Sequence, residues 1–269
     1  MNSGFQWQAL LIAWAGAALV MFAFWLVQRR TRTAGIVDVI WALVTPAAAI
    51  GLITAASGVV LQRGVLLSLL IGVWGARLGW HLFERLRRER EDGRYLAMKQ
   101  AVGEKRVQPV MFVFFQVQAL WAVMFALPVA AASLAPRGAL DWLDAAGAAV
   151  WLIALGGEWM ADRQLATFRT HPENRGRVCR RGLWAYSRHP NYFFEWLHWL
   201  AYVLIGFGSP YWWVTMAGLG LMYLFLNFVT GIPFTEQQAL RSRGDAYREY
   251  QRTTSRFFPM PPGNGKEQT

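Results

Sequence analysis

The sequence is poor in the residues that most often build disulfides and metal sites. Cys179 is its only cysteine, so the chain can form neither an intramolecular disulfide nor a thiolate metal site. Its few histidines show no metal-ligand spacing: His81, His171, His189 and His198. No Gly-x-Gly-x-x-Gly motif follows a predicted strand, which excludes a Rossmann dinucleotide site. We therefore expect no bound metal, and any nucleotide must bind between helices.

Apolar residues, by contrast, make up 55% of the 269 residues, against about 45–50% in soluble domains. They gather in blocks of about 20 residues, the length that crosses a hydrocarbon core of about 30 Å. Lipid offers no partner to unpaired backbone groups, so the blocks must be helices. A charged loop at 84–106 and a basic segment at 163–188 separate some of them. The pattern predicts an all-α integral membrane protein with seven transmembrane helices, at residues 10–27, 36–54, 65–83, 110–134, 140–160, 192–207 and 211–232.

The distribution of charge indicates topology. The net charge is +11, which in a soluble protein would suggest a nucleic-acid partner. Here nearly all lysines and arginines follow the first, third and fifth blocks or lie in the C-terminal tail, while the connections after the second and fourth blocks hold only Arg63 and Arg137. By the positive-inside rule, we expect the N-terminus outside and the C-terminus in the cytoplasm, with no nucleic-acid partner.

Polar residues inside the first four blocks are candidates for function, because burying them in a membrane is costly. Asp38 lies near the start of the second block, where it could also serve as an ordinary acid at a helix N-terminus. Arg77 lies in the middle of the third block and needs an acidic partner, for which Asp38 and Glu84 are candidates. Gln116 and Gln118 lie inside the fourth block, where they would line a substrate site or join helices.

Two pairs of polar residues, whose members are four positions apart, lie at the end of the fifth block and at the start of the sixth. Asn191 and Glu195 share one helix face after a helix start at Pro190, and Glu158 and Asp162 share another. Carboxylates and an amide can bind ribose hydroxyls or a nicotinamide carboxamide. A basic cluster could hold phosphates, although topology alone accounts for its charge: Arg169, Arg177, Arg180, Arg181 and Arg188.

The C-terminal tail contains one more predicted helix, at 235–256, in which apolar and aromatic residues lie among arginines. This amphipathic helix would lie on anionic lipid or close a cofactor pocket. Residues 263–269 are expected to form a disordered end.

The stretch from 182 to 196, which contains Arg188-His189-Pro190-Asn191-Tyr192, resembles the C-terminal signature of the steroid 5α-reductase family. Over almost its full length the chain is similar to bacterial membrane proteins of unknown function grouped with that family, the DUF1295 group. Segments 35–41, 74–78, 91–95 and 114–118 match other blocks of that group. The resemblance implies one catalytic domain over residues 1–262 in the bacterial inner membrane. Its substrate cavity would lie mainly in the first four spans, and its cofactor site mainly in 158–256, facing the cytoplasm.

The resemblance further implies NADPH as hydride donor and reduction of a carbon–carbon double bond conjugated to a ketone, in a 3-oxo-Δ4-steroid or another lipid-like enone. Two positions depart from the family. The family has a Tyr in its third span where this chain has Trp74. It also has a Gln-Glu pair near the start of its second span, where this chain keeps only an acid, Asp38. Protonated Asp38 is the first candidate donor to the substrate oxygen, with Arg77 or water replacing it if the two residues pair. The predicted cofactor contacts are Glu158, Asp162, Arg169, Arg177, Tyr186, Arg188, Asn191 and Glu195. The predicted catalytic residues are Asp38, Trp74 and Arg77, and the predicted substrate contacts are Asp38, Trp74, Gln116 and Gln118.

Two other functions stay open. The Arg-His-Pro-x-Tyr half of the signature also occurs in isoprenylcysteine and phospholipid methyltransferases, which bind S-adenosylmethionine. Asn191 and Glu195 favour the reductase over the methyltransferase when they are taken together with Asp162, Arg169 and Arg177. A non-catalytic transporter or lipid-binding protein is the third reading, but the sequence shows no inverted repeat.

Overall fold

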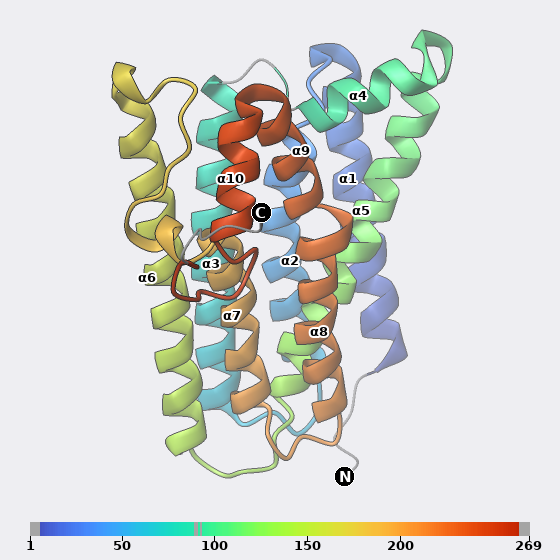
Figure 1. Ribbon diagram of the computed structural model, residues 1–269. Coiled ribbons are helices and arrows are strands. Elements are labelled where there is room, and N and C mark those ends of the chain that lie inside the picture. The colour runs from blue at the N-terminus through green and yellow to red at the C-terminus, as the bar shows by residue number, and fades with distance from the viewer. Residues whose placement is uncertain (1–5, 89–90, 92, 264–269) are drawn as a thin grey trace. The chain divides into compact units, whose positions relative to one another are not determined.

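The computed structural model describes residues 6–88, 91 and 93–263, and every regular element in this part of the chain is helical (Figure 1). Five segments of the described chain are long and apolar enough to cross a membrane: Trp7–Thr31, Ile36–Ala55, Leu61–Arg88, Glu104–Ala132 and Trp212–Arg243. The all-α, multi-pass membrane class is therefore confirmed, while the count of seven spans and the orientation stay predictions. The helices are α1 (Trp7–Thr31), α2 (Ile36–Ala55), α3 (Leu61–Arg88), α4 (Gly93–Val102), α5 (Glu104–Ala132), α6 (Trp142–Thr170), α7 (Pro190–Ile205), α8 (Trp212–Leu224), α9 (Ile232–Arg243) and α10 (Asp245–Thr253).

The chain forms two compact units. The first comprises Met1–Ala145 with Tyr202–Gly218, and the second comprises Ala146–Ala201 with Leu219–Thr269. The division falls inside α6, α7 and α8. The predicted substrate residues therefore belong to the first unit and the predicted cofactor residues to the second, and each set is described within its own unit.

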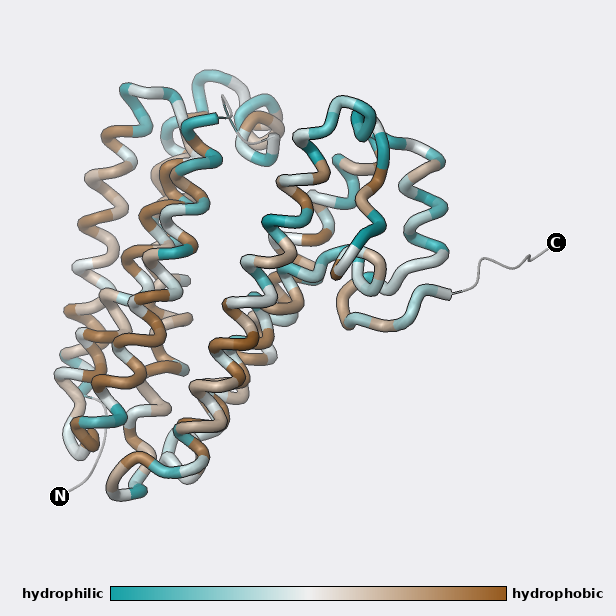
Figure 2. The backbone as a smooth tube through the Cα atoms, turned by 90° about the vertical axis from the view of Figure 1, so that its left-hand side faces the viewer, coloured by the Kyte–Doolittle hydropathy of each residue, from teal (hydrophilic) through white to brown (hydrophobic). Residues whose placement is uncertain are grey.

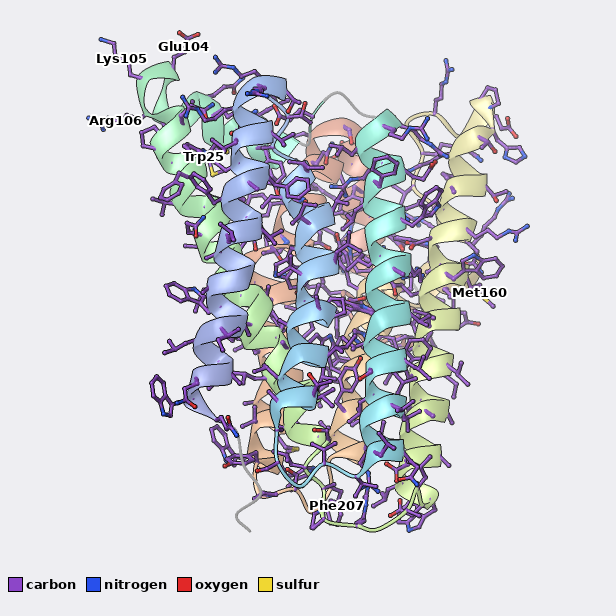
Figure 3. The ribbon with its side chains drawn as sticks, turned by 180° about the vertical axis from the view of Figure 1, so that it is seen from behind. Trp25, Glu104, Lys105, Arg106, Met160 and Phe207 are labelled. Carbon is purple, nitrogen blue, oxygen red and sulfur yellow. The ribbon has the colours of Figure 1, made fainter. Side chains whose placement is uncertain are left out.

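In the first unit, α1, α2, α3 and α5 pack side by side (Figure 1). Hydrophobic stretches, brown in Figure 2, run along the middle of these helices. Trp25 joins two of them, because its indole N–H donates to the carbonyl of Gln108 at 3.3 Å. The polar residues 104–106 extend away from the beginning of α5, and Phe207 lies at the opposite end of this unit (Figure 3).

A fully buried ion pair joins α3 to the start of α6. Arg63 Nε lies 2.9 Å from Asp144 Oδ1, and its Nη2 lies 2.9 Å from Oδ2. The other three N–H groups donate to the carbonyls of Ala135, Arg137 and Ala139 at 2.9–3.2 Å. All five donors of the guanidinium are thus used, which offsets the cost of removing its charge from water.

The polar stretch 84–106 was expected to be a charged loop, and this prediction is wrong. α3 continues to Arg88 and α4 fills most of the remainder, while residues 89, 90 and 92 lie outside the described chain. Lys99 Nζ lies 2.7 Å from both carboxylate oxygens of Glu91 and 2.6 Å from the carbonyl of Arg32. Tertiary contacts of this kind stabilise a short polar helix that local propensity alone leaves marginal.

In the second unit, α6 and α7 are in direct contact. A Cβ atom at Gly157 would lie 2.4 Å from the ring of Phe194, so only glycine permits this approach. α6 continues to Thr170, beyond the predicted end at residue 160, and two 3₁₀ turns at Pro172–Asn174 and Gly182–Ala185 then lead to α7. The polar pairs of α6 and α7 therefore lie on two helices that pack against each other.

The C-terminal tail forms two helices, so the single predicted helix at 235–256 is wrong. α8 continues through a π-helical turn, Phe225–Val229, into α9. Gly244 then ends α9 with φ 51° and ψ −123°, a conformation that L side chains rarely adopt. After this break α10 folds back, so that Ala239 packs with Tyr247 and Tyr250. Residues 264–269, most of the predicted disordered end, lie outside the described chain.

Candidate functional site

The polar pairs of α6 and α7 meet through Asn191 and Asp162. α7 begins at Pro190, a first-turn position where a missing N–H costs nothing. The Nδ2 of Asn191 donates to Asp162 Oδ1 at 3.2 Å. Its Oδ1 accepts from the backbone N–H of Tyr192 at 3.0 Å, which fixes the orientation of the amide. The structure thus brings together one member of each pair that the spacing singled out.

The other members of the two pairs, Glu158 and Glu195, are buried acids. Their exposed fractions are 7% and 8%. Glu195 Oε1 lies 3.9 Å from Nδ1 of His198, nearly one turn later on α7. Buried carboxylates need hydrogen-bond donors around them, so the acids of α6 and α7 mark a polar region inside the second unit.

The predicted phosphate contacts Arg169 and Arg177 lie at the surface of the second unit. Arg169 is exposed in the last turn of α6, and Arg177 is exposed in the loop that follows. Tyr186, also a predicted cofactor contact, is 48% exposed. Arg180 and Arg181 of the basic cluster are exposed as well. These side chains are accessible to an anionic ligand, which arginine can bind through two parallel hydrogen bonds.

Arg188 is engaged inside the protein. Its exposed fraction is 9%, and its Nε donates to Glu236 Oε1 on α9 at 2.7 Å. Its Nη1 donates to the carbonyls of Gln251 and Thr254 at 3.1 and 2.7 Å. The guanidinium therefore ties the residues before α7 to α9 and to the end of α10, a role different from the phosphate contact that the sequence suggested.

Glu236 is shared by four side chains. Besides Arg188, its Oε1 accepts from the Tyr247 hydroxyl at 3.4 Å and lies 3.2 Å from His189 Nε2. Its Oε2 accepts from Gln251 Nε2 at 3.1 Å. One carboxylate thus connects the helix start of α7 with both C-terminal helices.

The environment of His189 keeps its imidazole neutral at pH 7. Burial lowers the pKa of His189 below its ordinary value of 6.5, and the carboxylate of Glu236 opposes part of this effect. The ring stacks on Tyr192 with 5.6 Å between centroids. Burial also raises the pKa of Tyr247 above its ordinary value, so this hydroxyl stays a hydrogen-bond donor.

The chain after α10 is bonded to the residues just before α7. The backbone N–H of Arg188 donates to the carbonyl of Ser255 at 2.8 Å. The hydroxyl of Ser187 donates to the carbonyl of Phe257 at 2.8 Å. The Arg-His-Pro segment is therefore held by side chains of α9 and α10 and by the backbone that follows them.

In the first unit, Asp38 accepts two hydrogen bonds from α4. Tyr95 donates its hydroxyl to Oδ1 at 2.6 Å, and Arg94 Nη2 contacts Oδ2 at 3.0 Å. Asp38 acts here as an acceptor, which differs from the protonated donor that we expected. Both acids considered as partners of Arg77 pair with other arginines, Asp38 with Arg94 and Glu84 with Arg88.

The remaining predicted residues of the first unit lie in its core. Trp74 is fully buried and packs edge-to-face on Trp41, with centroids 6.1 Å apart. Gln116 Nε2 contacts the carbonyl of Ala18 at 3.4 Å, which joins α5 to α1. Gln118 is buried on α5. These contacts account for the packing of Trp74 and Gln116, and the catalytic and substrate roles stay predictions.

Three residues of these contacts, Glu236, Arg94 and Tyr95, are not among the residues that the sequence predicts for a site. Glu236 lies in the tail predicted to be an amphipathic helix, and an acid in the first turns of that helix is the one signal that points to it. Arg94 and Tyr95 lie in a segment predicted to be a loop. Across the described chain, no group of three or more histidine, cysteine or acidic residues is placed to hold a metal ion.

Comparison with known proteins gives a family without a described activity. The model of the DUF1295 family, proteins of unknown function, matches residues 24–254. An uncharacterized protein of Schizosaccharomyces pombe (strain 972 / ATCC 24843) is 27% identical over 271 residues, covering 89% of this chain and 76% of that protein. No solved structure matches the chain. The matched range contains both the contacts of Asp38 and the polar pairs of α6 and α7.

Proposed function

We propose that this chain, which belongs to the DUF1295 family, is a membrane enzyme that binds NADPH and reduces the carbon–carbon double bond of an apolar α,β-unsaturated ketone. The observation that carries the proposal is the hydrogen bond between Asn191 and Asp162, on two packed helices that also bury Glu158 and Glu195. These residues offer the oxygens of three carboxylates and of one amide as acceptors, and the amide nitrogen of Asn191 as a donor. That chemistry suits the hydroxyls of a ribose and the carboxamide of a nicotinamide.

The fit of the chain's residues to a dinucleotide extends to its phosphates. Arg169 and Arg177 are exposed guanidinium groups in the same unit as the polar pairs. They would bind the negatively charged phosphates, since arginine is suited to bidentate phosphate contacts. Arg188 is left out of the proposed contacts, because its side chain is already bonded to Glu236 and to backbone carbonyls.

In this proposal the bound cofactor supplies a hydride to the carbon β to the substrate's carbonyl. Asn191 and Glu195 orient the carboxamide. Negative charge would then develop on the substrate oxygen, where a hydrogen-bond donor lowers the barrier, and the resulting enolate would take a proton from water at its α-carbon. Asp38 already accepts hydrogen bonds from Arg94 and Tyr95, so its predicted role as a protonated donor is not part of the proposal. An apolar substrate such as a 3-oxo-Δ4-steroid would enter from the lipid, and NADPH from the cytoplasm.

The experiment that tests the cofactor assignment is the Glu195→Ala variant, purified in detergent and titrated with NADPH. Removing a charged hydrogen-bond partner of the carboxamide costs about 1.5–3 kcal/mol, which predicts a loss of affinity of roughly 10- to 150-fold. Glu249→Ala is the matched control, since this acid lies on the surface of α10 and pairs with Arg252. An affinity of Glu195→Ala equal to that of the control would show that Glu195 does not contact the cofactor.

The competing function is an S-adenosylmethionine-dependent methyltransferase. The Arg-His-Pro-x-Tyr signature at 188–192 is common to both enzyme classes. In this chain Arg188 and His189 contact Glu236, so the common half of the signature serves to hold the helix start. The half that favours the reductase is Asn191 with Glu195, opposite Asp162.

A further inference from the structure

We propose that Glu236 is a positioning residue for nucleotide binding, which holds Arg188 and His189 so that Asn191 faces Asp162. The inference rests on the proposed nucleotide function and adds to it a residue on a different helix that governs the site. Glu236 contacts the segment before α7 rather than the polar pairs themselves. Its influence therefore has to pass along the chain from Arg188 and His189 to Asn191.

The contacts of Glu236 restrict both residues before the helix. Its Oε1 lies 2.7 Å from Arg188 Nε and 3.2 Å from His189 Nε2, and all three side chains are mostly buried. Pro190 follows, and its ring fixes one backbone dihedral between His189 and Asn191. A shift of the imidazole would therefore also move the first residues of α7, because the backbone between them has little freedom to rotate.

A second contact from α9 acts on the same turn. The hydroxyls of Tyr192 and Thr235 lie 3.3 Å apart, and the ring of Tyr192 stacks on that of His189. The backbone N–H of Tyr192 donates to the Asn191 side chain. Thr235 and Glu236 are neighbours on α9, so this helix holds the first turn of α7 on both sides of Asn191.

The carboxylate also balances the charges around His189. The charged groups that face the imidazole are Glu236, Arg188 and Arg256. Without Glu236 the two arginines remain, and Arg188 keeps only its carbonyl partners Gln251 and Thr254. A buried cation that loses its counter-ion moves toward water or toward another acceptor. We expect that movement to turn Asn191 away from Asp162.

The test compares Glu236→Gln and Glu236→Asp with the surface control Glu249→Gln, by NADPH titration between pH 5.5 and 8.5. Glu236→Gln keeps the size of the side chain and loses its charge, and we expect its NADPH affinity at pH 7.5 to fall about tenfold. Glu236→Asp should recover part of this loss, and Glu249→Gln should match the wild type. We expect the NADPH affinity to fall at acid pH, where His189 takes up a proton. The pH at which half of the affinity is lost should be lower in Glu236→Gln, because the carboxylate that raises the pKa of His189 is gone.

Three results would overturn the inference, and they differ from failure of the proposed function. The first is a Glu236→Gln affinity and pH profile equal to those of the wild type. The second is a lower melting temperature of Glu236→Gln with unchanged NADPH affinity, which would make Glu236 purely structural. The third is equal loss in Glu236→Gln and Glu236→Asp with no shift in the midpoint. A wild-type protein that does not bind NADPH would overturn the proposed function itself and this inference with it.

Discussion

The two units each bury one arginine against one carboxylate, and the two pairs are built differently. In the first unit, Arg63 donates two hydrogen bonds to Asp144, and its other N–H groups donate to backbone carbonyls. In the second unit, Arg188 meets Glu236 through Nε alone, and Glu236 is shared with His189, among others. In the first pair Asp144 also contacts another arginine, Arg137, whereas the carboxylate of the second pair also contacts an imidazole.

The difference separates a structural ion pair from one that can serve a site. Every partner of Arg63 comes from the loop after α5 or from the start of α6, so the pair closes one end of the first unit. Partners of Arg188 come from α9, from α10 and from the backbone after α10, and all of them converge on the start of α7. We therefore expect damage to the first pair to appear as lost stability, and damage to the second as lost ligand affinity.

The largest expected effect is that of Asp144→Ala. The substitution leaves the charge of Arg63 buried without its counter-ion, which typically costs about 3–5 kcal/mol. Thermal unfolding in detergent should show a large drop in melting temperature. Asp245→Ala is the control, because its ion pair with Arg248 is at the surface and such pairs contribute about 0–1 kcal/mol. Equal melting temperatures for the two variants would contradict a structural role for the Arg63–Asp144 pair.

An intermediate effect is expected from replacing each arginine by lysine. Arg63→Lys keeps the charge but has three donors for five acceptor positions, so at least two hydrogen bonds are lost, at a net cost of about 0.5–1.5 kcal/mol each. Arg188→Lys should change the melting temperature less and the NADPH affinity more. The comparison between the two regions fails if Arg63→Lys is the variant that loses affinity while Arg188→Lys loses only stability.

The smallest effect is the pH dependence of stability that His189 contributes. Its pKa in the folded protein is lowered by burial, so the unfolded chain binds the proton more readily. Stability from this group is complete above about pH 6.5, the ordinary pKa, and declines as the pH falls below it, by at most about 1.4 kcal/mol per pH unit. Unfolding at a series of pH values checks this: His189→Gln should flatten the decline, and the exposed His171→Gln should leave it unchanged.

Much of the fold could be predicted from hydropathy, because lipid imposes one rule on every spanning segment. α2 begins at Ile36, where its apolar block begins. The two arginines that departed from the charge asymmetry, Arg63 and Arg137, both contact Asp144. The missed helix α4 has no apolar stripe and is held by contacts with distant residues, such as Arg94 with Asp38, that a local pattern does not contain.

The candidate site was predictable only in part, for the same reason. The spacing of four residues predicted that Asn191 and Glu195 share one helix face. The contact of Asn191 with Asp162 could be expected because the two residues lie on consecutive helices. The contact of Arg188 with Glu236 could not be predicted, because the two residues are 48 positions apart in the chain. A break at Gly244 also brings α10 back against α9, so that Gln251 reaches Glu236. Sequence periodicity does not predict that α10 folds back against α9.

The most direct test of the central claim is a thermal-stability titration of the detergent-purified wild-type protein with NADPH and, in parallel, with S-adenosylmethionine. A ligand that binds only the folded state stabilises it by about 2.7 kcal/mol at a hundred times its dissociation constant. We predict that NADPH raises the melting temperature with increasing concentration and that S-adenosylmethionine does not. Stabilisation by S-adenosylmethionine and not by NADPH would contradict the assignment of the polar pairs of α6 and α7 to a nicotinamide cofactor.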